Sequence, residues 1–184
     1  MKTFRKIIIP FLLMLVLLSG CSKNTESETA TPAERYVKIK DNIYFDEDGM
    51  EMSISKGADG KYKGAEIRTI TGQGSFSNGY FGGTFKPSNV KGTVSTFFLY
   101  TGPAEGNPHD EIDIEFLGKD TTKVQFNYYG GSDKSHEYMY ELGFDASQAF
   151  HQYGFYWDMQ RIVWFVDNQP VYQANTDIPT HQMK

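Results

Sequence analysis

The stretch HDEIDIEFLG, residues 109–118, decides how this sequence is interpreted. Its acids Glu111, Asp113 and Glu115 stand two residues apart, and apolar residues fill the alternate positions. Successive side chains of a β-strand point to opposite faces of the sheet. The stretch therefore predicts a strand with one apolar, core-facing side and one side that carries a row of three carboxylates.

Nine other short runs share this character. Each is rich in β-branched and aromatic residues and is bounded by Gly, Asn, Asp or Pro. The runs are residues 42–45, 50–55, 63–69, 80–86, 92–100, 122–129, 152–157, 162–166 and 170–173. The stretches FDEDGM (45–50) and VDNQPV (166–171) are typical of hairpin turns. No long segment has apolar residues at the 3.6-residue period of an amphipathic helix. We therefore expect an all-β fold, an antiparallel sandwich or jelly roll, rather than a parallel α/β sheet.

The first 20 residues have the pattern of a sorting signal. Three basic residues in MKTFRK precede the apolar run 7–18, which is too short to span a bilayer comfortably. The sequence LSGC at 18–21 resembles the lipobox of bacterial lipoproteins, in which Cys21 would become the lipidated first residue; an ordinary secretory signal is the alternative. We therefore expect an exported protein that touches a membrane only through a lipid anchor.

The segment after Cys21 is polar and lacks apolar periodicity. Residues 21–35 are expected to form the lipidated Cys and a flexible linker, and residues 36–184 one folded domain. Removal of residues 1–20 would take away three positive charges and change the net charge from −5 to −8. This acidic domain has no basic stripe, so we expect no nucleic-acid partner. We also expect a monomer.

The row of acids needs a physical reason, because like charges side by side weaken a sheet. A plain solvent-exposed strand and a calcium site are two explanations. A third is a pair of carboxylic acids acting on a glycosidic bond, where one attacks the anomeric carbon and the other protonates the leaving oxygen. Residues four apart on a flat strand are separated by about 13 Å, so this reaction requires a concave sheet that brings Glu111 and Glu115 together.

Crowding of three acids also separates their proton affinities. At least one of them should hold its proton to higher pH while another stays ionised. Asp113, between the two glutamates, is suited to hydrogen-bond one of them. Spacing alone does not say which glutamate is the acid and which is the nucleophile.

Residues 111–118, EIDIEFLG, resemble the catalytic motif of glycoside hydrolase family 16, in the uninterrupted form found in its lichenase (endo-β-1,3-1,4-glucanase) branch and in plant xyloglucan transglycosylases. The resemblance to the lichenase branch covers roughly residues 36–184 and includes FFLYTGP, GKDTTKVQFNYY and FHQYGFYWDMQRIVWFVDNQPV. It implies a jelly roll with a concave cleft and retaining, endo-acting cleavage of β-glucan. It also implies Glu111 as nucleophile, Glu115 as general acid/base and Asp113 in an assisting role.

By position, six further residues match those that line the family's glucan cleft: Glu66, Arg68, Phe98, Tyr100, Asn127 and Tyr129. Each pair lies two residues apart on an expected strand and therefore shares a face. Aromatic rings and fixed polar groups are what a sugar site requires. Core packing of each aromatic, and a plain ion pair between Glu66 and Arg68, are the alternatives.

The sequence also departs from the family pattern. His109 stands where lichenases usually carry Trp, while the transglycosylase branch has His there, which leaves the preferred glucan open. A lone histidine is more often a structural hydrogen-bonding residue, so we assign it no catalytic role. Relative to the family both ends look short, and we expect the catalytic domain to be incomplete at its C-terminus.

No cofactor is expected. The structural calcium site common in the lichenase branch is expected to lack ligands here, and a hairpin turn explains the acids of FDEDGM. The leading prediction is a lipid-anchored retaining endo-β-glucanase acting on β-1,3-1,4-glucan. The alternatives are a xyloglucan or glucan transglycosylase and an inactive glucan-binding surface module.

Overall fold

The computed structural model of this chain describes residues 8–9, 36–38, 42–47, 49–69 and 75–184. The expected signal sequence and linker lie outside these residues, apart from Ile8 and Ile9. Among the residues that are described, no helix is long and apolar enough to span a bilayer.

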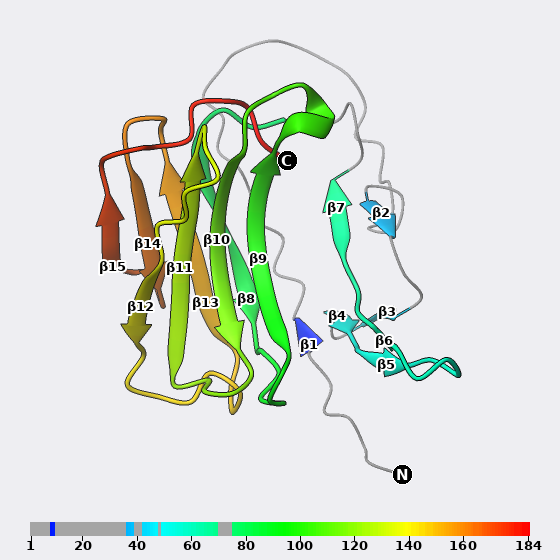
Figure 1. Cartoon of the computed structure of the whole chain (residues 1–184). Coiled ribbons are helices and arrows are strands. Elements are labelled where there is room, and N and C mark those ends of the chain that lie inside the picture. The colour runs from blue at the N-terminus through cyan, green and yellow to red at the C-terminus, as the bar shows by residue number, and fades with distance from the viewer. Residues whose placement is uncertain (1–7, 10–35, 39–41, 48, 70–74) are drawn as a thin grey trace, which may run out of the picture.

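Two four-stranded antiparallel sheets face each other and form a sandwich (Figure 1). One sheet has the order β12-β11-β10-β9, with β9 (Val94–Thr101), β10 (Asp110–Leu117), β11 (Lys123–Gly130) and β12 (Tyr138–Glu141). The other has the order β15-β14-β13-β8, with β8 (Gly79–Phe85), β13 (His151–Trp157), β14 (Ile162–Val166) and β15 (Gln169–Ala174). The expected all-β sandwich of jelly-roll type is confirmed.

Smaller sheets precede the sandwich in the chain. Their strands are β1 (Ile8–Ile9), β2 (Tyr36–Lys38), β3 (Ile43–Asp46), β4 (Gly49–Met52), β5 (Ser55–Lys56), β6 (Tyr62–Lys63) and β7 (Ile67–Thr69), paired as β1-β4-β3, β2-β7 and β5-β6. A short 3₁₀ turn, η2 (Pro103–Glu105), follows β9. In Figure 1, β2 to β7 are drawn to one side of the sandwich, on the side of β9.

The core lies between the two large sheets and is mainly aromatic. Phe116, Phe126, Phe155 and Trp164 are fully buried, and neighbouring rings pack edge-on or stacked across the interface. These side chains come from alternate positions of their strands, which is why the period-two pattern was visible in the sequence. Packing of this core fixes which face of β10 points outward.

Both expected hairpins are present. β3 and β4 pair as a hairpin, and at its end Asp46 Oδ1 accepts a hydrogen bond from the Gly49 amide. Asp167 and Asn168, both with positive φ, make the two-residue turn between β14 and β15. The sequence runs missed β12, because it is a largely exposed edge strand without an apolar alternation.

The C-terminal segment crosses from β15 to the edge of β9. Buried Asp110 accepts hydrogen bonds from the amides of Thr180 and His181, at 2.8 Å each. Lys184 then exchanges two backbone hydrogen bonds with Tyr100, both 3.0 Å. The segment thus fixes the beginning of the acid strand and the end of β9.

Candidate active site

Strand β10 presents its three acids on the outer face of its sheet. The apolar residues between them, Ile112 and Ile114, are completely buried on the opposite face. In addition, the indole nitrogen of Trp164 in the second sheet donates a hydrogen bond of 3.1 Å to the backbone oxygen of Asp113. The core therefore holds the acid strand by both its side chains and its backbone.

The register of the sheet places the predicted cleft residues beside the acids. Glu111 lies between Tyr100 of β9 and Tyr129 of β11, and this row carries the nucleophile expected from the resemblance. Asp113 lies between Phe98 and Asn127 in the next row. Directly opposite residues in a sheet share a face, so these side chains form one continuous surface.

Asp113 is the most buried member of the acid row, with 6% of its surface exposed. Burial raises its pKa to about 9, and the charges of Glu111 and Glu115 and a hydrogen bond with Glu111 act in the same direction. Asp113 therefore holds its proton at neutral pH and donates it in a hydrogen bond to Glu111.

Glu115 is partly buried and also holds its proton more tightly than a free glutamate does. Burial raises its pKa, a hydrogen bond of 3.0 Å from the Gln125 amide opposes that rise, and the charges of Glu111 and Glu137 add to it. The three acids thus differ in proton affinity, because the environment of Asp113 and of Glu115 raises it. This is the division that acid catalysis beside a carboxylate nucleophile needs.

Arg68 lies on β7 and Glu66 just before it, outside the sheet that carries the acids. Arg68 Nε donates a hydrogen bond to Glu66 Oε1, so the ion pair considered as an alternative is present. The bond to Glu66 raises the pKa of Arg68, and the charges of Glu105 and Tyr100 contribute in the same direction. The pair therefore lies within electrostatic reach of the end of β9, next to the Glu111 row.

Two residues that contact the acids were not among the predicted site residues. Gln125 hydrogen-bonds Glu115, and His109 Nε2 lies 2.7 Å from Glu111 Oε2. Both have the strand parity of the acids they contact, and that parity was the signal available in the sequence. Their side-chain directions could only be read from the structure.

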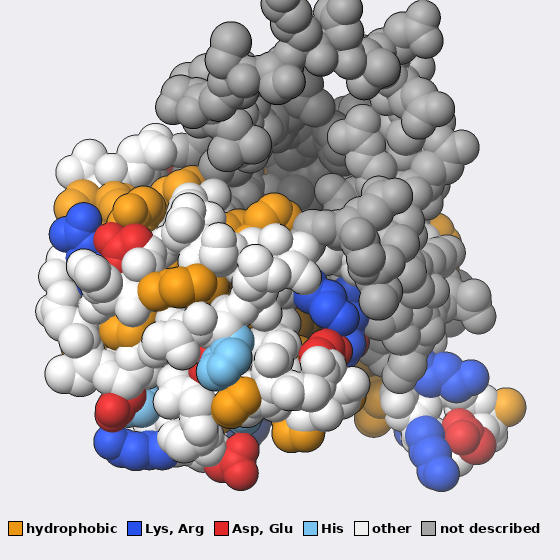
Figure 2. All heavy atoms as spheres, turned by 90° about the horizontal axis from the view of Figure 1, so that it is seen from above, with side chains coloured by type: hydrophobic (Ala, Val, Ile, Leu, Met, Phe, Trp, Pro, Cys, Tyr) orange, Lys and Arg blue, Asp and Glu red, His pale blue; other side chains and the backbone are white. Residues whose placement is uncertain are grey.

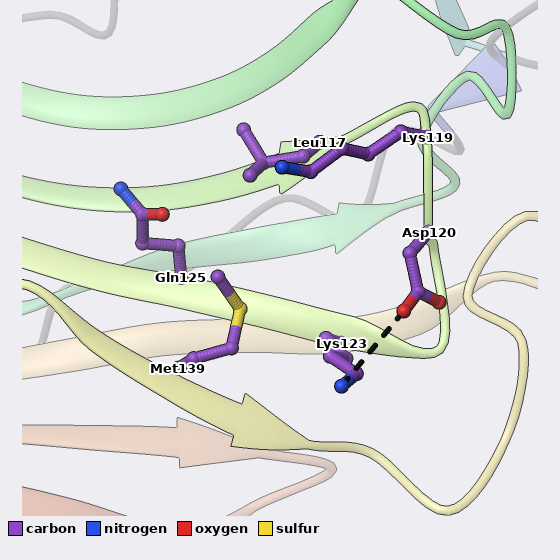
Figure 3. A pocket seen from close by; sticks show the side chains of 6 residues that line it. All are labelled: Leu117, Lys119, Asp120, Lys123, Gln125 and Met139. Carbon is purple, nitrogen blue, oxygen red and sulfur yellow. Dashed lines mark ion pairs between the residues drawn. The ribbon is translucent and has the colours of Figure 1, made fainter.

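A pocket of about 220 Å³ adjoins the Glu115 end of the acid row (Figure 3). It is lined by Leu117, Lys119, Asp120, Lys123, Gln125 and Met139. Leu117 and Met139 supply apolar surface, while Lys123 pairs with Asp120 at 3.9 Å. Gln125 belongs both to this pocket and to the hydrogen bond on Glu115, so the pocket and the acid row are contiguous.

On the face shown in Figure 2, acidic and basic side chains of the described residues lie in small mixed groups among uncharged and hydrophobic ones. Within the described part of the chain, no group of three His, Cys, Asp or Glu side chains is placed to hold a metal ion. The raised pKa values of Asp113 and Glu115 arise mainly from burial and from the charges of neighbouring acids.

An outward row of unequal carboxylates on a jelly roll, flanked by aromatic and amide side chains, is typical of carbohydrate-active enzymes. The family model of glycosyl hydrolases family 16 matches residues 31–183, and this chain belongs to that family.

Relatives with related sequences are named beta-glucanase. One from Bacillus subtilis (strain 168) is 46% identical over 131 residues, which are 71% of this chain and 53% of that protein. One from Acetivibrio thermocellus is 52% identical over 118 residues, 64% of this chain and 34% of that protein. The chain thus spans about half or less of the length of these relatives.

Solved structures agree with the fold. The beta-glucanase of Bacillus licheniformis superposes with a TM-score of 0.78 at 36% identity, covering 84% of this chain and 78% of that one. Laminarinase and transglycosylase structures also match, but at 21% identity they show the fold alone.

Proposed function

We propose that this protein is a retaining endo-β-glucanase that cleaves β-1,3-1,4-glucan by double displacement. The observation that carries the proposal is the outward row of Glu111, Asp113 and Glu115, in which burial keeps the proton on Asp113 and favours it on Glu115. The beta-glucanase names of the relatives support the substrate class.

In the first step, a carboxylate oxygen of Glu111 attacks the anomeric carbon and the bond to the leaving oxygen breaks. Glu115 gives its proton to that oxygen, so the leaving chain departs as an alcohol. In the second step, Glu115 takes a proton from a water molecule, the water oxygen attacks the anomeric carbon, and the bond to Glu111 breaks. Two inversions give net retention.

The neighbouring residues support this chemistry by position. Tyr100, Tyr129 and Phe98 supply aromatic surface for pyranose rings, and Asn127 is a polar group fixed by a 3.0 Å hydrogen bond from the His136 amide to its side-chain oxygen. The pocket beyond Gln125 offers apolar and charged surface on the general-acid side. Hydrolysis is favoured over transfer because the transglycosylase likeness extends only to the fold.

The test measures reducing ends released from barley-type β-glucan, lichenan, laminarin and xyloglucan. We expect release from the first two, with the β-anomer as the initial product by NMR. Glu111→Ala and Glu115→Ala should each lower turnover by a factor on the order of 10²–10⁴ while glucan binding is kept. Glu141→Gln on exposed β12 is the matched control and should keep wild-type turnover.

Added azide distinguishes the two roles. It should rescue Glu111→Ala to an α-glycosyl azide and Glu115→Ala to a β-glycosyl azide, because azide replaces the nucleophile in one variant and the activated water in the other. Absence of reducing ends from all four glucans would refute the function, and the opposite pair of azide products would reverse the roles.

We further propose that the enzyme is exported and anchored through lipid on Cys21. The support is the basic and apolar start of the chain followed by LSGC. Wild-type protein expressed in a bacterial host should partition into detergent with the mass of a lipidated Cys, and Cys21→Ser should remain in the aqueous phase. Equal partition of both would refute the anchor.

A further inference from the structure

His109 connects the nucleophile to a second carboxylate. It lies two residues before Glu111 and shares its face, with Nε2 2.7 Å from Glu111 Oε2. On the other side of the ring, Nδ1 lies 3.3 Å from Oδ1 of Asp133. The three side chains form a line from the solvent-exposed Asp133 through the imidazole to the acid row.

Two tyrosines fix the plane of this ring. Tyr129 stacks on it, with ring centroids 4.2 Å apart and planes inclined by 15°, and Tyr100 contacts it edge-on at 5.6 Å. They are also the direct cross-strand partners of Glu111. The same two strands therefore set the position of both the nucleophile and the histidine, and the imidazole is held with little freedom.

The partners of the two ring nitrogens define its charge state. A neutral imidazole has one N–H donor and one acceptor nitrogen, whereas the imidazolium has two donors. Both nitrogens here face carboxylate oxygens, which only accept hydrogen bonds. Burial lowers the pKa of His109, but the hydrogen bonds and charges of Glu111 and Asp133 outweigh that effect and raise it.

The charged and titratable groups around the ring come from four elements. Those that face it are Glu111 on β10, Tyr100 on β9, Tyr129 on β11 and Asp133 after β11, with the Glu66–Arg68 pair near Tyr100. Both groups in hydrogen-bond contact with the ring are carboxylates, and both favour the imidazolium.

We propose that His109 is a positioning residue for the nucleophile: as an imidazolium held by Asp133, it binds Glu111 Oε2 and favours the ionised carboxylate. The inference rests on the proposed function. His109 transfers no proton in either step. Asp113 donates to the same carboxylate, so Glu111 is held between two donors.

The first experiment is the pH profile of kcat/KM on lichenan. In His109→Ala the nucleophile loses the cation that favours its ionised form, so the acid limb should move upward by about one pH unit or more. His109→Gln can keep a neutral N–H donor toward Glu111. Its plateau rate should therefore be higher than that of His109→Ala, while its acid limb should stay at the displaced pH. Asp133→Asn should displace the limb in the same direction by less.

The matched control is His151 on β13, which has the same kind of surroundings in the other sheet, away from Glu111. Its ring stacks on Phe144 at 3.9 Å and its Nδ1 lies 2.7 Å from Asp167. His151→Gln should leave the acid limb at the wild-type pH. A purely structural role for His109 would lower the plateau rate and the melting temperature but leave the limb in place, and that result would overturn the proposal.

A second measurement is independent of turnover. Imidazole ¹⁵N NMR of the full chain should show both His109 nitrogens protonated at pH 6, and Glu111→Gln should move the His109 titration to lower pH. A neutral ring at pH 6, or an unchanged titration in Glu111→Gln, would refute the pairing even if the protein cleaves glucan. Absence of glucan cleavage with the NMR result as expected would refute only the proposed function.

Discussion

Replacement of Asp113 by Asn should make the protein more stable at neutral pH. Asp113 is 6% exposed and its pKa is raised to about 9 by burial and by the neighbouring glutamates. The unfolded chain releases this proton near the ordinary value of 3.8, whereas the folded protein keeps it. A rise in pH through this interval therefore favours the unfolded state, and stability is lost progressively between about pH 4 and pH 9.

The magnitude follows from the linkage between protons and folding. Each pH unit in which only the unfolded state is ionised costs about 1.4 kcal/mol. Between pH 5 and pH 7 this group alone should lower the free energy of unfolding of the wild type by about 3 kcal/mol. The amide of Asn has the same shape as the carboxyl group and does not ionise, so Asp113→Asn should lack this part of the pH dependence.

The assay is guanidinium unfolding at pH 5, 6 and 7, with the free energy of unfolding extrapolated to water. The wild type should lose about 3 kcal/mol more than Asp113→Asn over the two units, and the variant should be the more stable protein at pH 7. Asp145→Asn is the control. The hydrogen bonds from Thr121 and Ser147 lower the pKa of Asp145 to about 2, so this acid is ionised in both states from pH 5 to pH 7 and its loss should leave the slope unchanged.

Equal slopes for the wild type and Asp113→Asn would refute the reasoning, because they would mean that Asp113 ionises in the folded protein as it does in the unfolded chain. The variant is also expected to lose activity, since the amide that replaces the Asp113 carboxyl group would lie between Glu111 and Glu115 without a carboxyl proton to donate. A gain in stability at the cost of turnover is expected when a buried acid that assists the nucleophile is replaced.

Three further outcomes follow from single contacts. Gln125→Leu removes the hydrogen bond that lowers the pKa of Glu115, so the alkaline limb of the pH profile of kcat/KM should move upward by about one pH unit or less. An alkaline limb at the same or a lower pH would contradict that role of Gln125. Asp110→Asn places an amide group among four donors, which are the amides of Gly131, Thr180 and His181 and the ring Nδ1 of His181. Denaturant unfolding should show a loss of about 3 kcal/mol, whereas a loss below about 1 kcal/mol would be inconsistent with four accepted bonds. Tyr153→Phe deletes a buried hydroxyl without a hydrogen-bond partner among the described residues, so its melting temperature should stay equal or rise, and a clear fall would show that the hydroxyl is bound.

The sequence by itself determined the strand that carries the chemistry. Alternation of acids with Ile112, Ile114 and Phe116 defines a two-faced strand through local geometry alone, because the side-chain direction reverses at every residue. The same rule gave most of the sandwich strands and both hairpins. It failed for β12, whose exposed edge position leaves no apolar period to detect.

Only the tertiary structure decided which strands lie beside the acids. The register sets Tyr100 and Tyr129 on either side of Glu111, and Gln125 against Glu115, through pairings between residues about 10 to 20 positions apart. Proton affinity is decided in the same way, because the pKa of Asp113 depends on burial and on neighbouring charges rather than on its own side chain.

His109 shows the difference between the two kinds of information. Its parity with Glu111 is present in the sequence, yet its function depends on a partner 24 residues further along the chain, Asp133, and on two tyrosine rings from neighbouring strands. Contacts between distant segments form only when the core packs. The local pattern therefore predicts which face His109 lies on, while the folded sheet decides its charge state and the atom that it binds.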